Sequence, residues 1–297
     1  MPIEPLVSAE WLAGRMAGPM AKALRIVHIS TDRTTYDVAH IPGAVFSDLH
    51  VDLAKGGSRP ETGGVPRQYI LPTRDDVAAT LGRWGVAADT HVLFYDDAGN
   101  SRYAARGYWL LRAYGFPADQ VHLLNGGLQA WQSENRPTSA AEPTVEPVDA
   151  PAPLTDADPG LLATAEDMLA WSREAAAAGG DPDAERPTRI LDVRTIDEFL
   201  GTDVRARRGG RIAGSQHRLF ADFLTPEGKL RDRAQTLAIL EGSGVRPGEL
   251  RATYCQGGVR AALAWFALHE VAGLSQVRNY AGSWEEWGNR DDLPVEK

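Results

Sequence analysis

The 297-residue chain has one cysteine, and this scarcity excludes several kinds of site. A single cysteine cannot form an internal disulfide or supply a thiolate cluster for zinc. No apolar run approaches the roughly 20 residues that a membrane-spanning helix needs. The first residues, Met1-Pro2-Ile3-Glu4, contain no basic segment followed by an apolar core. We therefore expect no signal peptide and a cytoplasmic protein.

Positive charge is also scarce, with 31 lysines and arginines against 40 aspartates and glutamates and a net charge of −9. This balance argues against nucleic acid or an anionic membrane surface as a partner. It does not exclude small anionic substrates, because one cleft can be locally positive on an acidic protein. The length is comfortable for two domains of ordinary size.

The chain carries the same order of signals twice. The first half has strand-like runs at 25–30 and 92–96, a helical stretch at 103–114, and the segments His40-Ile41-Pro42-Gly43-Ala44 and Asn125-Gly126-Gly127-Leu128-Gln129-Ala130-Trp131. The second half has strand-like runs at 189–194 and 252–255, a helical stretch at 260–271, and the segments Arg211-Ile212-Ala213-Gly214-Ser215 and Ala281-Gly282-Ser283-Trp284-Glu285-Glu286-Trp287.

Short buried strands that alternate with helices predict an α/β fold, a mainly parallel sheet flanked by helices in each half. Residues 136–159 are rich in proline and alanine and indicate an extended linker. We therefore predict one domain over 1–136, a linker over 137–159 and a second domain over 160–297.

The cysteine lies in Tyr254-Cys255-Gln256-Gly257-Gly258-Val259-Arg260, between a predicted strand and a predicted helix. Two glycines let the backbone curl, so that the amides of Gln256, Gly257, Gly258, Val259 and Arg260 can point at one centre. Such surroundings favour a reactive thiolate. A lone cysteine is otherwise most simply a small buried apolar residue, and that reading needs no such loop.

A cysteine phosphatase is a second interpretation of this loop. In those enzymes five residues separate the cysteine from the arginine, which gives a loop wide enough for a phosphoryl group. Only four residues separate Cys255 from Arg260. The shorter loop suits a single added sulfur atom better.

Together these motifs resemble the tandem-domain rhodanese family, the thiosulfate and 3-mercaptopyruvate sulfurtransferases, over nearly the whole chain. The resemblance is carried by Asp192-Val193-Arg194 with Glu198-Phe199, by Gly210 to Ser215, by the cysteine loop and by Ser283-Trp284-Glu285-Glu286-Trp287. It implies two rhodanese-like domains and a persulfide on Cys255. It also implies a first domain that is a catalytically silent copy.

The first half agrees with that implication, because Asp96-Asp97 stand where the second half has Cys255. A carboxylate cannot accept a transferable sulfur. Metal binding by the two aspartates is an alternative, but a solvated or loop-capping pair is the simpler interpretation.

The resemblance leaves the sulfur donor open. Members that act on thiosulfate often have basic residues just after the cysteine, where this chain has Gln256 and Gly257. The mercaptopyruvate branch has serine in place of Gly257 and an arginine in place of Glu198. The Asp192, Arg194 and Glu198 set resembles the general pattern of bacterial thiosulfate enzymes, so we favour thiosulfate.

Three arginines are candidate substrate-binding residues. Arg260 can reach a substrate anion or pair with a carboxylate at the domain interface, and Arg194 can bind a ligand at the strand edge or pair with Asp192 or Glu198. Arg207 lies in a basic loop that can overhang the cleft or remain a solvated face. His217 is an acid–base candidate or a packed, hydrogen-bonded histidine. Trp284 and Trp287 are expected in the core.

The expected reaction is ping-pong transfer from a small-molecule sulfur donor to cyanide or a thiol, with a protein sulfur acceptor as a further candidate. We expect no metal and no organic cofactor. A non-catalytic binding module is the alternative from another functional class, and it would regain weight if the thiol were unreactive at neutral pH.

Overall fold

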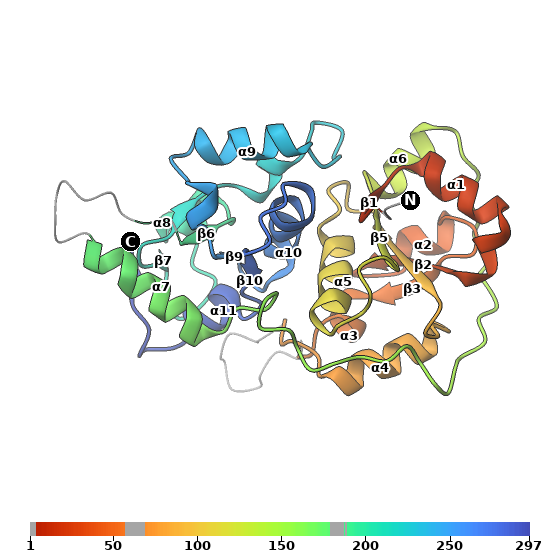
Figure 1. Ribbon diagram of the computed structural model, residues 1–297, viewed down its shortest axis with the longest axis horizontal. Helices are drawn as coiled ribbons and strands as arrows, with labels where there is room; N and C mark the ends of the chain where they lie inside the picture. Colours follow the sequence, from red (N-terminus) through yellow and green to blue (C-terminus); the bar gives the residue numbers. More distant parts are fainter. Residues whose placement is uncertain (1–3, 57–68, 179–186, 188) are drawn as a thin grey trace. The chain divides into compact units, whose positions relative to one another are not determined.

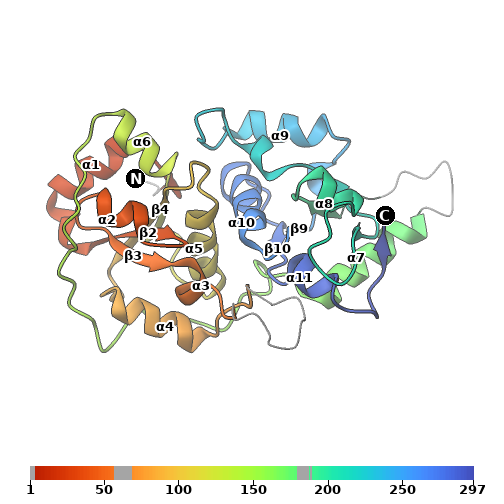
Figure 2. The ribbon, with the colours of Figure 1, turned by 180° about the vertical axis from the view of Figure 1, so that it is seen from behind.

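The computed structural model describes residues 4–56, 69–178, 187 and 189–297. These residues form two compact units (Figures 1 and 2). The described residues of the first unit fall within 1–55, 72–158 and 225–230, and those of the second within 56–71, 159–224 and 231–297. The domain boundaries predicted from the sequence, 1–136 and 160–297 with a linker over 137–159, remain a proposal.

The first unit is built on a five-stranded parallel sheet with the strand order β1-β5-β4-β2-β3. Its strands are β1 (Leu6–Val7), β2 (Leu24–Ser30), β3 (Val45–Asp48), β4 (His91–Asp96) and β5 (Val121–Leu124). Its helices are α1 (Ala9–Ala17), η1 (Pro19–Ala23), α2 (Thr34–Val38), α3 (Leu49–Asp52), α4 (Arg74–Arg83), α5 (Arg102–Ala113) and α6 (Gly127–Ser133).

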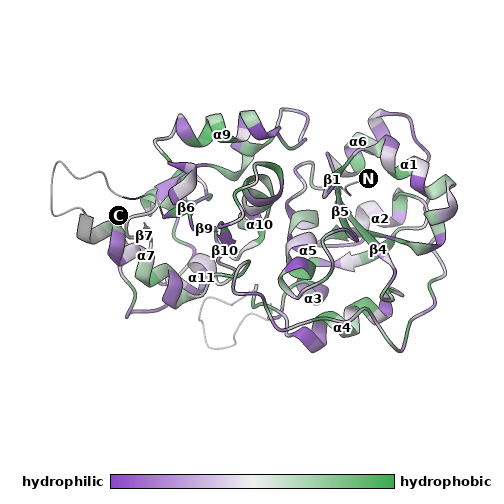
Figure 3. Ribbon diagram, viewed as in Figure 1, coloured by the Kyte–Doolittle hydropathy of each residue, from purple (hydrophilic) through white to green (hydrophobic). Residues whose placement is uncertain are grey.

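Alternate residues of these strands face opposite helical layers. Ile26 and Leu93 belong to a buried cluster that includes residues of α1 and α6, whereas Ile29 and Phe94 lie against Gly107 of α5. Both faces of the sheet are therefore covered, which explains why the middle of β4 is hydrophobic (Figure 3).

Residues 136–158 contain no helix and run along the first unit. Their backbone bonds include Val148 N–H to Gly82 O at 3.0 Å, Ala152 N–H to Val86 O at 2.9 Å and Thr155 N–H to Tyr114 O at 2.8 Å. The segment is thus extended and held by main-chain hydrogen bonds.

The second unit has a four-stranded parallel sheet with the order β10-β9-β6-β8, and a two-stranded antiparallel pair, β11-β7. Its strands are β6 (Ile190–Asp192), β7 (Arg211–Ile212), β8 (Gln216–His217), β9 (Ala252–Tyr254), β10 (Arg278–Asn279) and β11 (Val295–Glu296). Its helices are α7 (Ala165–Ala178), α8 (Ile196–Leu200), η2 (Phe220–Phe223), α9 (Arg233–Glu241), η3 (Pro247–Glu249), α10 (Val259–Trp265), the π-helical η4 (Phe266–Val271) and α11 (Ser283–Trp287).

The two sheets repeat one topology, as the sequence predicts. The order β5-β4-β2-β3 in the first unit corresponds to β10-β9-β6-β8 in the second. A tyrosine near the carboxyl end of each central strand makes the same contact. Ile41 N–H donates to the Tyr95 hydroxyl at 3.0 Å, and Ile212 N–H donates to the Tyr254 hydroxyl at 3.1 Å.

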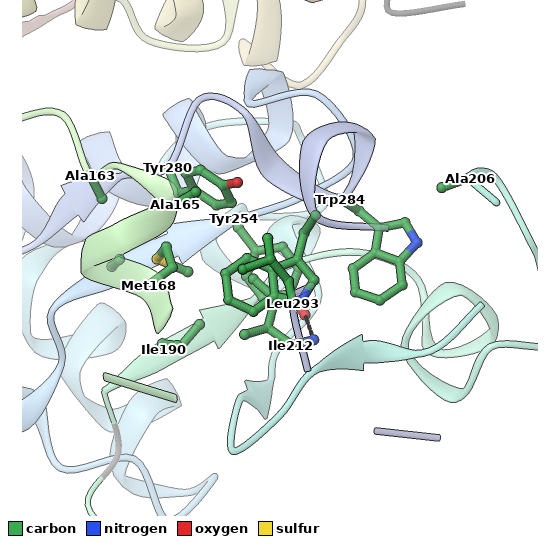
Figure 4. Packing of buried hydrophobic residues seen from close by; sticks show 12 residues of the cluster. Ala163, Ala165, Met168, Ile190, Ala206, Ile212, Tyr254, Tyr280, Trp284 and Leu293 are labelled. Atoms are coloured by element: carbon green, nitrogen blue, oxygen red, sulfur yellow. Dashed lines mark hydrogen bonds between the residues drawn. The ribbon is translucent and has the colours of Figure 1, made fainter. Parts of the chain in front are cut away.

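The core of the second unit lies beside β6, β9 and α11, where Figure 4 shows Tyr254, Ile190 and Met168 packed together. Trp284 and Trp287 are buried there, which confirms that they are core aromatics. Among the described helices, none combines the length and the apolar character that crossing a bilayer requires.

Candidate active site

The cysteine lies at the carboxyl end of a central strand, where open parallel sheets place their ligands. β9 ends at Tyr254, Cys255 follows it, and α10 begins at Val259. Gly258 caps this helix with φ +81°, a left-handed conformation that favours glycine. Its N–H donates to Cys255 Sγ at 3.2 Å. The loop thus turns a main-chain amide onto a sulfur atom whose residue is only 1% exposed.

A second segment holds the cysteine backbone. Cys255 N–H donates to the Ser283 hydroxyl at 3.1 Å, and this hydroxyl donates to Tyr280 O at 2.8 Å. Trp284 N–H donates to Cys255 O at 2.9 Å. Ser283 takes φ +51° in this position, which is uncommon outside glycine. Sequence reasoning placed Ser283 in a motif but gave it no role.

The arginine of the loop is held by a buried carboxylate. Arg260 Nη1 and Nη2 donate to the two oxygens of Glu198 at 2.7 and 2.8 Å, a bidentate pair. Thr195 caps α8 and donates through its N–H and hydroxyl to Glu198 Oε2 at 3.1 and 3.0 Å. A carboxylate partner for Arg260 was expected at the domain interface, and this location was wrong, because Glu198 belongs to the same unit as Arg260.

Opposing effects fix the charges of this pair. Burial by itself would raise the pKa of the Glu198 carboxyl, but the bonds from Arg260 and Thr195 lower that pKa to about 2. Burial would also lower the pKa of Arg260, but its bonds to Glu198 and the nearby Cys255 raise it. A permanent ion pair thus lies beside the cysteine.

The chain matches one known protein family over most of its length. The profile of the rhodanese-like domain matches residues 8–134 and 174–290. The chain belongs to the rhodanese family. The thiosulfate sulfurtransferase of Corynebacterium glutamicum is 34% identical to it over 301 residues, which cover 99% of this chain and 90% of that protein. The sulfur carrier protein TtuD of Thermus thermophilus is 28% identical, covering 99% and 97%.

A solved structure extends this relationship to the fold. The crystal structure of the 3-mercaptopyruvate sulfurtransferase SseA from Escherichia coli has a TM-score of 0.73 and 25% identity, and the match covers 95% of this chain and 99% of that one. The α/β fold with two rhodanese-like segments is confirmed. The named relatives support sulfurtransferase activity for this rhodanese.

In this rhodanese Arg194 has the geometry of a structural ion pair. Its Nε lies 3.0 Å from both oxygens of Asp192, and its Nη2 donates to Asp192 Oδ2 at 2.6 Å and to Gly210 O at 2.7 Å. The guanidinium stacks 4.6 Å from the Trp284 ring. Arg194 is only 1% exposed, so this arrangement favours the ion-pair alternative over substrate binding.

Arg207 lies on an exposed part of the basic loop. Its side chain is 61% exposed and pairs with Asp291 at 3.0 Å. The loop itself does meet the cysteine loop, because Gln256 Nε2 donates to Arg205 O at 3.0 Å. The structure thus brings the backbone of the basic loop, and not the Arg207 charge, to the site.

His217 is a satisfied histidine in this rhodanese. Its Nε2 donates to Arg194 O at 2.8 Å, and its ring packs 5.0 Å from the Phe199 ring. This arrangement favours the packed interpretation over an acid–base role.

In the first unit of the rhodanese, the Asp96 carboxylate binds the loop that corresponds to the cysteine loop. Asp96 Oδ2 accepts from Tyr103 N–H at 2.8 Å and Ala104 N–H at 3.1 Å, and Oδ1 accepts from Ala98 N–H at 3.2 Å. Burial raises the pKa of Asp96, and the amide bonds oppose that rise. The side chain caps the loop and α5. No third metal ligand joins Asp96 and Asp97 among the residues that the structure describes.

Proposed function

We propose that this rhodanese transfers a sulfane sulfur from thiosulfate to cyanide or a thiol through a persulfide on Cys255. The observation that carries the proposal is the Gly258 N–H that points at Cys255 Sγ from 3.2 Å. An amide at this distance stabilises an anionic sulfur without any rearrangement at the moment of reaction. The amides of Gln256, Gly257, Val259 and Arg260 complete the loop around the terminal sulfur.

The cycle has two displacements at sulfur. The Cys255 thiolate attacks the outer sulfur of thiosulfate, a new S–S bond forms, and sulfite leaves with the electron pair of the broken S–S bond. Cyanide or a thiolate then attacks the terminal sulfur of the persulfide. Thiocyanate or an acceptor persulfide leaves, and the Cys255 thiolate is restored.

Arg260 contributes a fixed positive charge to this cycle. Its side chain is 15% exposed, and Glu198 occupies both terminal nitrogens. The pair holds the guanidinium next to the loop, where it attracts the donor anion. Arg194 and Arg207 supply less, because one is buried against Asp192 and the other is exposed beside Asp291.

The donor and acceptor are argued from chemistry and likeness. A relative that is 34% identical is named a thiosulfate sulfurtransferase, whereas the mercaptopyruvate enzyme is 25% identical, and this difference supports thiosulfate. The likeness to a sulfur carrier protein supports a protein thiol as a further acceptor. The first domain, with Asp96 in place of the cysteine, takes no part in sulfur transfer.

Intact mass measurement tests the proposal. The protein is incubated with thiosulfate or with 3-mercaptopyruvate, and cyanide is then added. We expect a gain of one sulfur atom from thiosulfate, its loss on cyanide treatment, and no gain in Cys255→Ser. Faster loading from mercaptopyruvate would assign the other donor. A free thiol that takes sulfur from neither donor would contradict the persulfide cycle and favour a binding module.

A further inference from the structure

Gly257 is restricted by space and not by its backbone. It is absent from the described residues with a left-handed φ, so its main chain is open to any residue type. A Cβ atom at this position would lie 2.2 Å from Cδ2, 2.6 Å from Cγ and 2.8 Å from Cβ of Tyr69. These are inner atoms of the tyrosine, which cannot swing away as a flexible side-chain end can. The ring of Tyr69 therefore occupies the space that a side chain at 257 would fill.

Tyr69 is fixed to the same structure that fixes the cysteine loop. Its N–H donates to Glu285 Oε2 at 3.1 Å, and Glu285 is 4% exposed. Glu285 N–H in turn donates to Gln256 O at 2.8 Å, next to the Trp284 N–H bond to Cys255 O. The loop is thus held by hydrogen bonds from the main-chain amides of residues 284 and 285, and the ring of Tyr69 packs against it at Gly257.

We propose that Tyr69 is a positioning residue for sulfur transfer, an inference that rests on the persulfide cycle proposed above. The ring presses on Gly257 and so keeps the adjacent Gly258 amide directed at the Cys255 sulfur. The ring also places a neutral aromatic surface in the space that a side chain at position 257 would otherwise fill. Tyr69 and a side chain at 257 are mutually exclusive, so each determines what the other position can be.

Five proteins test this role: the wild type, Tyr69→Phe, Tyr69→Gly, Gly257→Ala and the Tyr69→Gly/Gly257→Ala double variant. The readout is the single-turnover rate of sulfur loading from thiosulfate, followed by intact mass at increasing thiosulfate concentration. Tyr69→Phe keeps all three atoms that contact position 257 and should load at nearly the wild-type rate. Tyr69→Gly should load about 10-fold or more slowly at saturating thiosulfate, because an ångström of misplacement is enough for that loss.

The double variant gives the decisive comparison. Gly257→Ala alone should load slowly because its Cβ collides with the ring, and removal of the ring should restore part of the rate. Rescue would show that the ring and a side chain at 257 compete for one space, because residues in contact do not act additively. The positioning role itself is tested by slower loading of Tyr69→Gly than of Tyr69→Phe at saturating thiosulfate. Ile70→Ala, a change at the neighbouring half-exposed residue, is the matched control and should load normally.

The outcomes separate the two proposals. A wild-type protein that takes no sulfur refutes the persulfide cycle and the role of Tyr69 with it. A wild-type protein that loads, together with a Tyr69→Gly variant of equal rate or a double variant no faster than Gly257→Ala, refutes the role of Tyr69 alone. If Gly257→Ala does not fold, the comparison of Tyr69→Gly with Tyr69→Phe still decides.

Discussion

Ser283 combines an unfavourable backbone conformation with a hydrogen bond to the candidate nucleophile, and two substitutions separate these effects. Ser283→Ala removes the hydroxyl and keeps a Cβ at φ +51°. Ser283→Gly removes the hydroxyl and also relieves the backbone. The first unit shows that glycine suits this turn, because Gly127 stands at the corresponding position with φ +57°.

The magnitudes follow from the contacts. Without the hydroxyl, the buried N–H of Cys255 loses its partner, which costs about 1–3 kcal/mol. The left-handed conformation costs a residue with a Cβ roughly 1–2 kcal/mol. Glycine avoids that cost, but its more flexible unfolded chain lowers the free energy of unfolding by about 0.4–1 kcal/mol. We expect Ser283→Ala to be the least stable of the three proteins and Ser283→Gly to lie between it and the wild type.

Urea unfolding followed by tryptophan fluorescence measures the stabilities, and sulfur loading from thiosulfate measures the site. Both variants should load sulfur more slowly to a similar extent, because both lose the hydroxyl that fixes the Cys255 backbone. Ser172→Ala is the matched control, since the buried Ser172 hydroxyl donates to Ala213 O at 2.7 Å away from the cysteine loop. Equal stability of the alanine and glycine variants, or normal loading in both, would refute this reasoning.

Two pH-dependent predictions follow from buried titratable groups. The pKa of Glu198 is lowered to about 2 against burial by its bonds to Arg260 and Thr195, so its stabilising contribution is present above pH 4.5 and lost as the pH falls toward 2. In urea titrations Glu198→Gln should be less stable than the wild type by about 3 kcal/mol at pH 7, and the gap should close at acid pH; a constant gap would contradict this. Burial lowers the pKa of His122 to about 4, so the folded state binds fewer protons than the unfolded one and loses stability as the pH falls from 6.5 to 4. His122→Phe should remove about 3 kcal/mol of that loss, and an unchanged pH slope would count against it.

The repeated fold was predictable because its signals are local. The residue pattern that predicts a strand or a helix spans only a few residues. The matching order of these patterns in the two halves predicts two sheets of one kind. The predicted helix at 103–114 is found as α5, Arg102–Ala113, one residue earlier at each end. The predicted helix at 260–271 continues from α10 into the π-helical η4, a change of hydrogen bonding that apolar spacing does not reveal.

The partners of the site were less predictable, because they are distant in sequence. Arg260 finds Glu198 62 residues away, and Tyr69 lies 216 residues from Glu285, whose carboxylate holds it. The sequence proposed a carboxylate partner for Arg260 and an ion pair for Arg194 as alternatives, but choosing among them needs the register of the sheet. A glycine with an ordinary φ, such as Gly257, offers no sequence sign that a distant ring fills its space.

The two halves differ in which main-chain donors their loops offer to the residue that follows the central strand or ends it. In the first unit four residues separate Asp96 from the helix cap at Ser101, and the carboxylate reaches the first amides of α5. In the second unit only two residues separate Cys255 from the Gly258 cap, and the amide comes to the sulfur instead. The Asp96 carboxylate accepts three amides of its own loop and helix, whereas the Cys255 sulfur accepts the Gly258 amide, which in the proposed cycle lies beside the transferable sulfur. Loop length and the identity of one residue therefore distinguish the copy proposed to be silent from the one proposed to carry sulfur, on an otherwise repeated sheet.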